Sequence, residues 1–198
     1  MSDITDLIFE DHTWFREQFA VLDDLRATRT TTQAGTAELE RVWRPLADRL
    51  DVHAVAEEEI FYPQLLRVGE DPEDETLDAI GDHNDIRDGV RDAENVDVGS
   101  DEWWAAVDRA RLANDEHRAE EEREGLANFR RTAPSGLREA LGRRFAAYFA
   151  EHPSRATVDT SDKDPEEYVE ANEDTGSSAG PERTPEAGGL GIGSLKGQ

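Results

Sequence analysis

The chain has 198 residues, enough for one well-buried domain, and its length does not require a second. It carries 47 Asp and Glu against 22 Lys and Arg, a formal net charge of −25, which excludes nucleic acid and anionic membranes as natural partners. It has no cysteine, which excludes disulfides, iron–sulfur clusters and thiolate zinc sites. Imidazole and carboxylate are therefore the strong metal ligands that remain.

The basic residues are almost all arginine, with lysine only at Lys163 and Lys196. A very acidic surface with little lysine suits a protein that stays hydrated in molar salt, so we expect a halophilic source. The first ten residues lack the basic start and apolar run of a leader, and no apolar stretch approaches the length of a bilayer span. We expect a soluble, cytoplasmic protein.

Apolar residues recur at helical spacing up to Pro153, and this period predicts an all-α domain over residues 1–152. The first helix is expected near residues 3–27, with His12 on its apolar stripe. The second is expected near residues 36–66, disturbed by Pro45 and Pro63, with His53 and Glu57 on its stripe. Side chains on these stripes are expected to point into the core.

The third helix is expected to begin at Pro72 with Asp71 as its cap, and it carries an inward His83. The fourth runs from Ser100 to about residue 131 and carries the inward residues His117 and Glu121. A fifth helix follows from residue 135 and is expected to pack across the outside. The fold class is therefore an antiparallel four-helix bundle with an additional C-terminal helix.

Residues 153–198 have few apolar side chains and many Glu, Asp, Gly, Ser and Pro. Such a segment cannot bury enough surface to offset its ordering entropy, so we predict a disordered, acidic, glycine-rich tail. Its removal is expected to leave helicity and metal content unchanged.

Four of the five histidines lie on the inward stripes, one on each of the first four helices. Glu follows His by four residues in the second and fourth helices, which stacks each pair on one helix face. Two buried carboxylates without arginine or metal partners would cost several kcal/mol each, and a pair of metal ions removes that cost. The predicted ligands are His12, His53, Glu57, His83, His117 and Glu121, with Glu58 as a candidate extra or outer ligand.

Counting residues to the connecting loops places His12 and His53 at similar depth in the bundle. The same count leaves His83 and His117 roughly 8 Å apart along the axis. The loop near residues 96–99 would have to absorb this difference.

The order His, His-x-x-x-Glu-Glu, His, His-x-x-x-Glu-Glu resembles the HHE cation-binding branch of the hemerythrin-like family over about residues 3–150. The resemblance implies an oxo- or hydroxo-bridged di-iron centre with Glu57 and Glu121 as bridges. Manganese and zinc accept the same ligands and stay open as other candidate metals. Oxygen carriers of the family have a second His four residues after that of the third helix. This sequence has Arg87 there, which speaks against an oxygen-carrier role.

Three functions stay open on the sequence. The first is a non-enzymatic iron protein that binds or senses dioxygen or nitric oxide, or that serves iron homeostasis. The second is a di-iron enzyme that acts on peroxide or nitric oxide, or repairs iron centres. The third is a metal-free helical adaptor. The sequence identifies no redox or protein partner.

Overall fold

The computed structural model describes residues 3–28 and 33–177, and no strand occurs among them. The all-α prediction is thereby confirmed. The elements, in chain order, are α1 (Ile4–Ala27), α2 (Gln33–Ala56), the π-helix η1 (Glu57–Phe61), α3 (Tyr62–Val68), α4 (Glu73–Glu94), α5 (Asp101–Arg123), α6 (Gly125–Thr132), α7 (Ser135–Glu151), the 3₁₀-helix η2 (Arg155–Thr157) and α8 (Pro165–Ser177).

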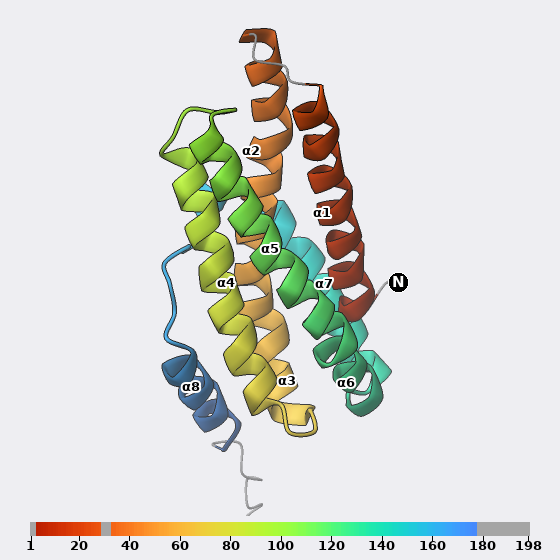
Figure 1. Ribbon diagram of the computed structural model, residues 1–198. Helices are drawn as coiled ribbons and strands as arrows, with labels where there is room; N and C mark the ends of the chain where they lie inside the picture. Colours follow the sequence, from red (N-terminus) through yellow and green to blue (C-terminus); the bar gives the residue numbers. More distant parts are fainter. Residues whose placement is uncertain (1–2, 29–32, 178–198) are drawn as a thin grey trace, which may run out of the picture.

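Four long rods form the bundle: α1, α2 continued by η1 and α3, α4, and α5 (Figure 1). Helix α1 packs against α2, and α4 packs against α5, so that each sequence-adjacent pair forms a helical hairpin. Helix α7 lies against α1 and α2 and covers the bundle from outside. The predicted bundle with one additional helix is confirmed.

Two apolar clusters fill the core, and the inward histidines lie between them. One cluster includes Phe15 of α1 and Ile86 of α4, and the other includes Ile8 of α1 and Ala79 of α4. His12 falls between Ile8 and Phe15 in sequence, and His83 falls between Ala79 and Ile86 in the same way. A polar layer therefore divides an otherwise apolar core, whose burial on both sides stabilises the bundle.

Close packing of α4 on α5 depends on Gly89. A Cβ atom there would lie 2.6 Å from the backbone nitrogen of Ala110 and 2.8 Å from its Cα. Any side chain at residue 89 would push the two helices apart. The short approach holds the helices that carry His83 and His117 close together.

The helix ends follow the predictions only in part. Ser100 caps α5 by accepting a hydrogen bond from the Trp103 amide at 3.0 Å, as predicted. Asp71 does not act as the predicted cap of α4, because its φ of +47° turns it into the left-handed region and Pro72 occupies the cap position. Helix α2 continues through Pro45, whereas the π-helical segment lies just before Pro63.

The predicted disordered tail needs correction for residues 153–177. This stretch contains η2 and α8, and α8 packs against α3 and α4 (Figure 1). Arg155 binds the buried Asp51, with its Nε 2.8 Å from Oδ2, and Val169 of α8 is buried. Composition missed this because a few specific polar contacts, not a broad apolar face, hold the segment. Residues 178–198 of the predicted tail lie outside the described residues.

None of the described helices combines the length and the apolar character needed to cross a bilayer.

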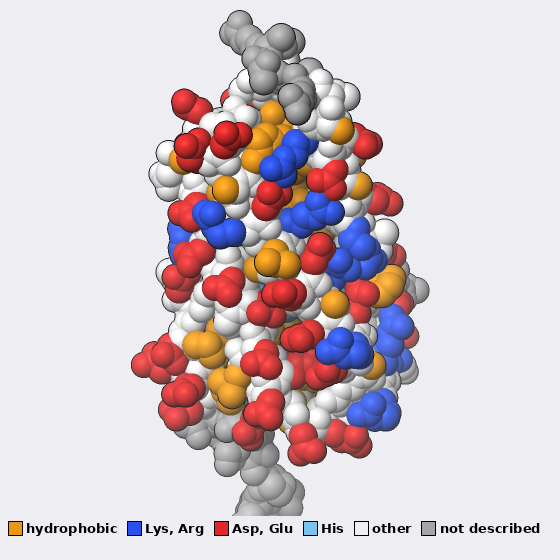
Figure 2. Space-filling view, viewed as in Figure 1, with side chains coloured by type: hydrophobic (Ala, Val, Ile, Leu, Met, Phe, Trp, Pro, Cys, Tyr) orange, Lys and Arg blue, Asp and Glu red, His pale blue; other side chains and the backbone are white. Residues whose placement is uncertain are grey.

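Acidic side chains cover much of the visible surface, with arginines between them (Figure 2). We expect the melting temperature to rise by roughly 5–10 °C between about 0.1 and 2 M KCl, because salt screens the self-repulsion of a net charge of −25. Thermal denaturation followed by circular dichroism measures this. A melting temperature that stays constant or falls would show that surface ion pairs, which salt weakens, outweigh the repulsion.

Candidate metal centre

The six predicted residues lie together in the middle of the core. Helix α1 supplies the first histidine, α2 the second, η1 the first glutamate, α4 the third histidine, and α5 the last pair. None is more than 4 % exposed, so a cluster of titratable groups is shielded from water. The residues are His12, His53, Glu57, His83, His117 and Glu121.

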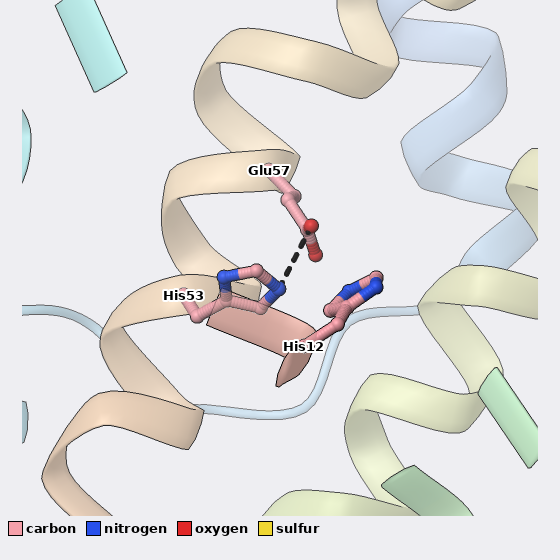
Figure 3. Close-up of side chains that lie close together, drawn as sticks. All are labelled: His12, His53 and Glu57. Carbon is pink, nitrogen blue, oxygen red and sulfur yellow. Dashed lines mark ion pairs between the residues drawn. The ribbon is translucent and has the colours of Figure 1, made fainter. Parts of the chain in front are cut away.

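One half of the cluster is formed by His12, His53 and Glu57, which point toward one another (Figure 3). Each offers a ligand atom, and these atoms lie within 4.8 Å of one another. The closest approach joins His53 Nε2 to Glu57 Oε1 at 2.9 Å. This spacing can hold one metal ion.

The other half is formed by Glu57, His83 and His117, whose ligand atoms also lie within 4.8 Å of one another. His83 Nε2 lies 3.3 Å from Glu57 Oε2 and 3.2 Å from His117 Nε2. The two histidines therefore sit at the same height, and the mismatch of roughly 8 Å expected from residue counting does not occur. Glu57 belongs to both halves, with Oε1 toward one and Oε2 toward the other.

Glu121 lies beside the first half but belongs to neither group of three. Its Oε2 is 3.3 Å from His12 Nε2, and its Oε1 accepts a hydrogen bond from the Tyr62 hydroxyl at 2.7 Å. The two glutamates are therefore not equivalent, although the sequence repeat suggested that they would be.

Several buried polar atoms of the cluster make no hydrogen bond within the described part of the chain. They are His12 Nε2, His53 Nε2, both carboxylate oxygens of Glu57 and Oε2 of Glu121. Leaving buried donors and acceptors unpaired costs roughly 1–3 kcal/mol each. All five atoms are metal-ligand types directed at one another, so the residues fit a bound cation.

The π-helical segment explains how Glu57 and Glu58 are both buried although they are adjacent in sequence. The Tyr62 amide donates to the Glu57 carbonyl, five residues back, which widens this turn. Pro63 has no N–H to donate to the Glu59 carbonyl, so the regular pattern cannot continue there. The wider turn directs Glu57 toward the histidines and Glu58 toward α4.

Each inward histidine also faces a carboxylate with its other ring nitrogen. Since an ionised carboxylate only accepts hydrogen bonds, Nδ1 carries a proton in either charge state of the ring, and Nε2, which is directed at the centre, offers its lone pair to a metal ion once its own proton has left. The Nδ1 partners are Glu122 for His12 at 3.1 Å, Asp11 for His53 at 3.0 Å, Glu58 for His83 at 2.9 Å, and Asp82 for His117 at 3.6 Å.

Three of these outer carboxylates are in turn held by cations. Glu122 binds Arg16 at 3.2 Å and Asp11 binds Arg49, while Glu58 binds both a guanidinium and an ammonium group. Glu58 was predicted as an extra or outer ligand, whereas the sequence pattern predicted no role for the other outer carboxylates. Their positions in the sequence carried a signal, because each of the four is adjacent to an inward His or Glu.

In the absence of a bound metal ion, two histidines of the centre hold their protons tightly. Burial lowers the pKa of His53, but the carboxylates of Glu57 and Asp11 outweigh it and raise that pKa to about 10. Burial likewise opposes the charge on His117, and Asp82 and Glu57 raise its pKa to about 10. Burial favours the neutral form of Glu57, yet the surrounding histidines hold its pKa well below the usual value. A metal ion entering the centre must displace these protons, so its affinity should fall as the pH is lowered.

A small cavity of about 20 Å³, enough for one water molecule, opens beside the centre. Tyr62, His117 and Glu121 line its inner side, and Glu75, Asp78 and Glu124 are among the residues on its outer side. Only very small molecules can therefore approach the cluster here.

Glu75 carries a raised pKa of about 8, because burial and the carboxylates of Glu121 and Glu124 oppose its charge. A folded pKa above the unfolded value means that the folded state binds more protons between about pH 4.5 and 8, so stability falls as pH rises through this window. We expect Glu75→Gln to flatten this dependence in the metal-free protein and to stabilise it above pH 8. The expected gain is on the order of 1–2 kcal/mol after solvent screening is allowed for.

Urea unfolding of both proteins at pH 5 and pH 9 measures the effect. Asp78→Asn, an exposed position on the same helix and cavity, is the matched control. A gain in stability that is equal at both pH values would contradict the assignment.

A family model described as the hemerythrin HHE cation binding domain matches residues 3–154, about three quarters of the chain. No curated protein and no solved structure gave a match. The match spans all six residues of the cluster and ends before most of the segment that carries η2 and α8.

Proposed function

The chain belongs to the hemerythrin HHE cation-binding family, and from this premise we propose that its core binds two iron ions for iron, dioxygen or nitric oxide binding or sensing. The family match supports cation binding, and the His and Glu residues of the cluster support a pair of iron ions. Imidazole and carboxylate ligands suit iron, although manganese and zinc accept the same ligands.

The observation that carries the proposal is the shared position of Glu57. Its two oxygens face two different pairs of histidines, an arrangement suited to one carboxylate between two metal ions. On this proposal His12 and His53 hold one ion and His83 and His117 hold the other. Glu121 contributes Oε2, which faces His12 and makes no hydrogen bond among the described residues.

Iron bound here would supply redox chemistry and affinity for dioxygen or nitric oxide. The chain itself orients the ligands, because each Nδ1 faces a carboxylate and directs Nε2 inward. The Tyr62 hydroxyl lies beside the small cavity and donates a hydrogen bond to Glu121. Burial of the whole cluster excludes bulk water and large substrates.

Elemental analysis of protein purified in air, together with its optical spectrum, tests the proposal. We expect close to two iron ions per chain. A chain that holds no metal under any loading condition would overturn the proposal and favour the helical adaptor.

An enzymatic role is the alternative, since the cavity beside Tyr62 and Glu121 admits molecules as small as peroxide or nitric oxide. Steady-state turnover of peroxide and nitric oxide by the iron-loaded protein separates the two. We expect binding without sustained turnover, and many turnovers per chain would establish the enzyme instead.

A further inference from the structure

Glu58 is a buried carboxylate held by three donors. Its Oε1 accepts from His83 Nδ1 at 2.9 Å and from Arg87 at 2.7 Å, and its Oε2 accepts from Lys163 Nζ at 2.6 Å. Glu58 is only 2 % exposed, so each donor matters to the cost of burying its charge. The third donor comes from a residue beyond the part of the chain that matches the family.

The backbone of Lys163 is fixed to the helix that carries His83. Asn84, the next residue after His83, donates its side-chain amide to the Lys163 carbonyl at 2.8 Å and accepts from the Lys163 amide at 3.0 Å. Farther along, the Tyr168 hydroxyl donates to the backbone carbonyl of Glu58 at 2.6 Å. The segment is therefore tied to α4 and to η1, the two elements that present His83 and Glu57.

Other contacts hold this segment, residues 153–172, which we call the strap. Arg155 pairs with Asp51 at 2.8 Å, Arg91 of α4 pairs with Asp162 at 2.9 Å, and Val169 is buried. The strap is thus anchored by contacts that do not involve Glu58. Removal of the Lys163 ammonium group alone should leave the strap in place.

We propose that Lys163 is a positioning residue of the metal centre, acting through Glu58 on His83; the inference rests on the proposed metal binding. Lys163 holds Oε2, which leaves Oε1 directed at His83 Nδ1, and this contact in turn directs His83 Nε2 at Glu57. Charge-assisted hydrogen bonds of this kind are short and directional. The strap then belongs to the metal-binding unit, contrary to the expectation that residues beyond 153 could be removed without effect.

The four inward histidines provide an internal comparison. The carboxylates behind His12 and His53 are held by arginines of the bundle itself, Arg16 and Arg49. Only behind His83 does a cation from outside the bundle join the described contacts. Loss of Lys163 should therefore affect the ion bound by His83 and His117 and spare the other.

The test is titration of the metal-free, full-length protein with cobalt(II), followed by calorimetry and by visible absorption. We expect two cobalt ions in the unmodified protein. Lys163→Met should weaken one of them by roughly 10–100-fold and alter its absorption band, while the second ion is unchanged. Lys163→Arg, which restores a cation, should recover both the affinity and the band.

Arg91→Met is the matched control, because it removes an ion pair of the strap without touching Glu58. It should behave like the unmodified protein. If Lys163→Met loses helicity, Lys163→Gln, which keeps an N–H donor, is measured in its place. Two cobalt ions with unchanged affinities and spectra in the Lys163 variant would overturn the positioning role, whereas no cobalt in the unmodified protein would overturn the proposed function itself.

Discussion

Glu57→Gln is expected to remove both metal ions from the protein, whereas His12→Ala is expected to remove at most one. The difference follows from geometry, because Glu57 faces both pairs of histidines and His12 belongs to only one group. Glutamine keeps the size of the side chain but loses its charge, which leaves the half with His83 and His117 without a carboxylate and the other half with Glu121 alone. We expect metal content to fall from about two ions per chain to near zero, an affinity loss of at least about 100-fold.

Glu59→Gln is the control for this change. Glu59 lies in the same π-helical segment, but it is exposed and contacts only the Tyr148 hydroxyl, at 3.3 Å, among the described interactions. Its substitution should leave both ions bound. Metal analysis after gel filtration measures all three variants, and loss of a single ion in Glu57→Gln would show that this carboxylate does not span the two halves.

Helical periodicity sufficed to place the inward residues. Each of the four inward histidines lies on the same helix face as apolar residues. Because that face packs against the other helices, a side chain on it points into the core. The bundle and its extra helix followed from the same pattern. The structure brings five of the six candidates into two groups of ligand atoms and places Glu121 beside one of them, and their role as metal ligands stays a prediction.

What the sequence did not predict lies in contacts between distant elements. The difference between Glu57 and Glu121 depends on Tyr62, which reaches across from α3 to α5. The relative height of His83 and His117 along the bundle axis depends on how closely α4 approaches α5 at Gly89. Counting residues to the loop takes no account of this approach. Lys163 contacts Glu58, which lies 105 residues earlier in the chain, whereas the composition of the segment around Lys163 predicted a disordered tail.

Arg87→Met is expected to destabilise the metal-free protein by about 3 kcal/mol, which lowers the melting temperature by about 6–12 °C. Arg87 is 1 % exposed and binds Glu58 at 2.7 Å and Asn84 at 3.3 Å. Methionine fills much of the space but leaves a buried carboxylate with one fewer cation. Removing one partner of a buried ion pair is costly because the remaining charge stays desolvated.

The pH dependence should identify the cause of the loss. Burial opposes the charge of Glu58, but His83, Arg87 and Lys163 lower its pKa to about 2. A lowered folded pKa contributes stability that is present above about pH 4.5 and is lost as pH falls toward 2. The difference between the unmodified protein and Arg87→Met should therefore shrink over this window, where both proteins come to carry a neutral Glu58.

Two further variants decide between a charge effect and simple loss of packing. Arg109→Met removes an exposed ion pair with Asp92 and should cost less than about 1 kcal/mol. The double variant Arg87→Met with Glu58→Gln removes both buried charges and should cost less than the sum of the two single changes. Additive costs would mean that Arg87 stabilises the core by its bulk alone. In that case Arg87 would only occupy space at the position where an oxygen carrier of the family has histidine. A cost below the sum would show that the guanidinium stabilises the ionised Glu58, on which the orientation of His83 depends.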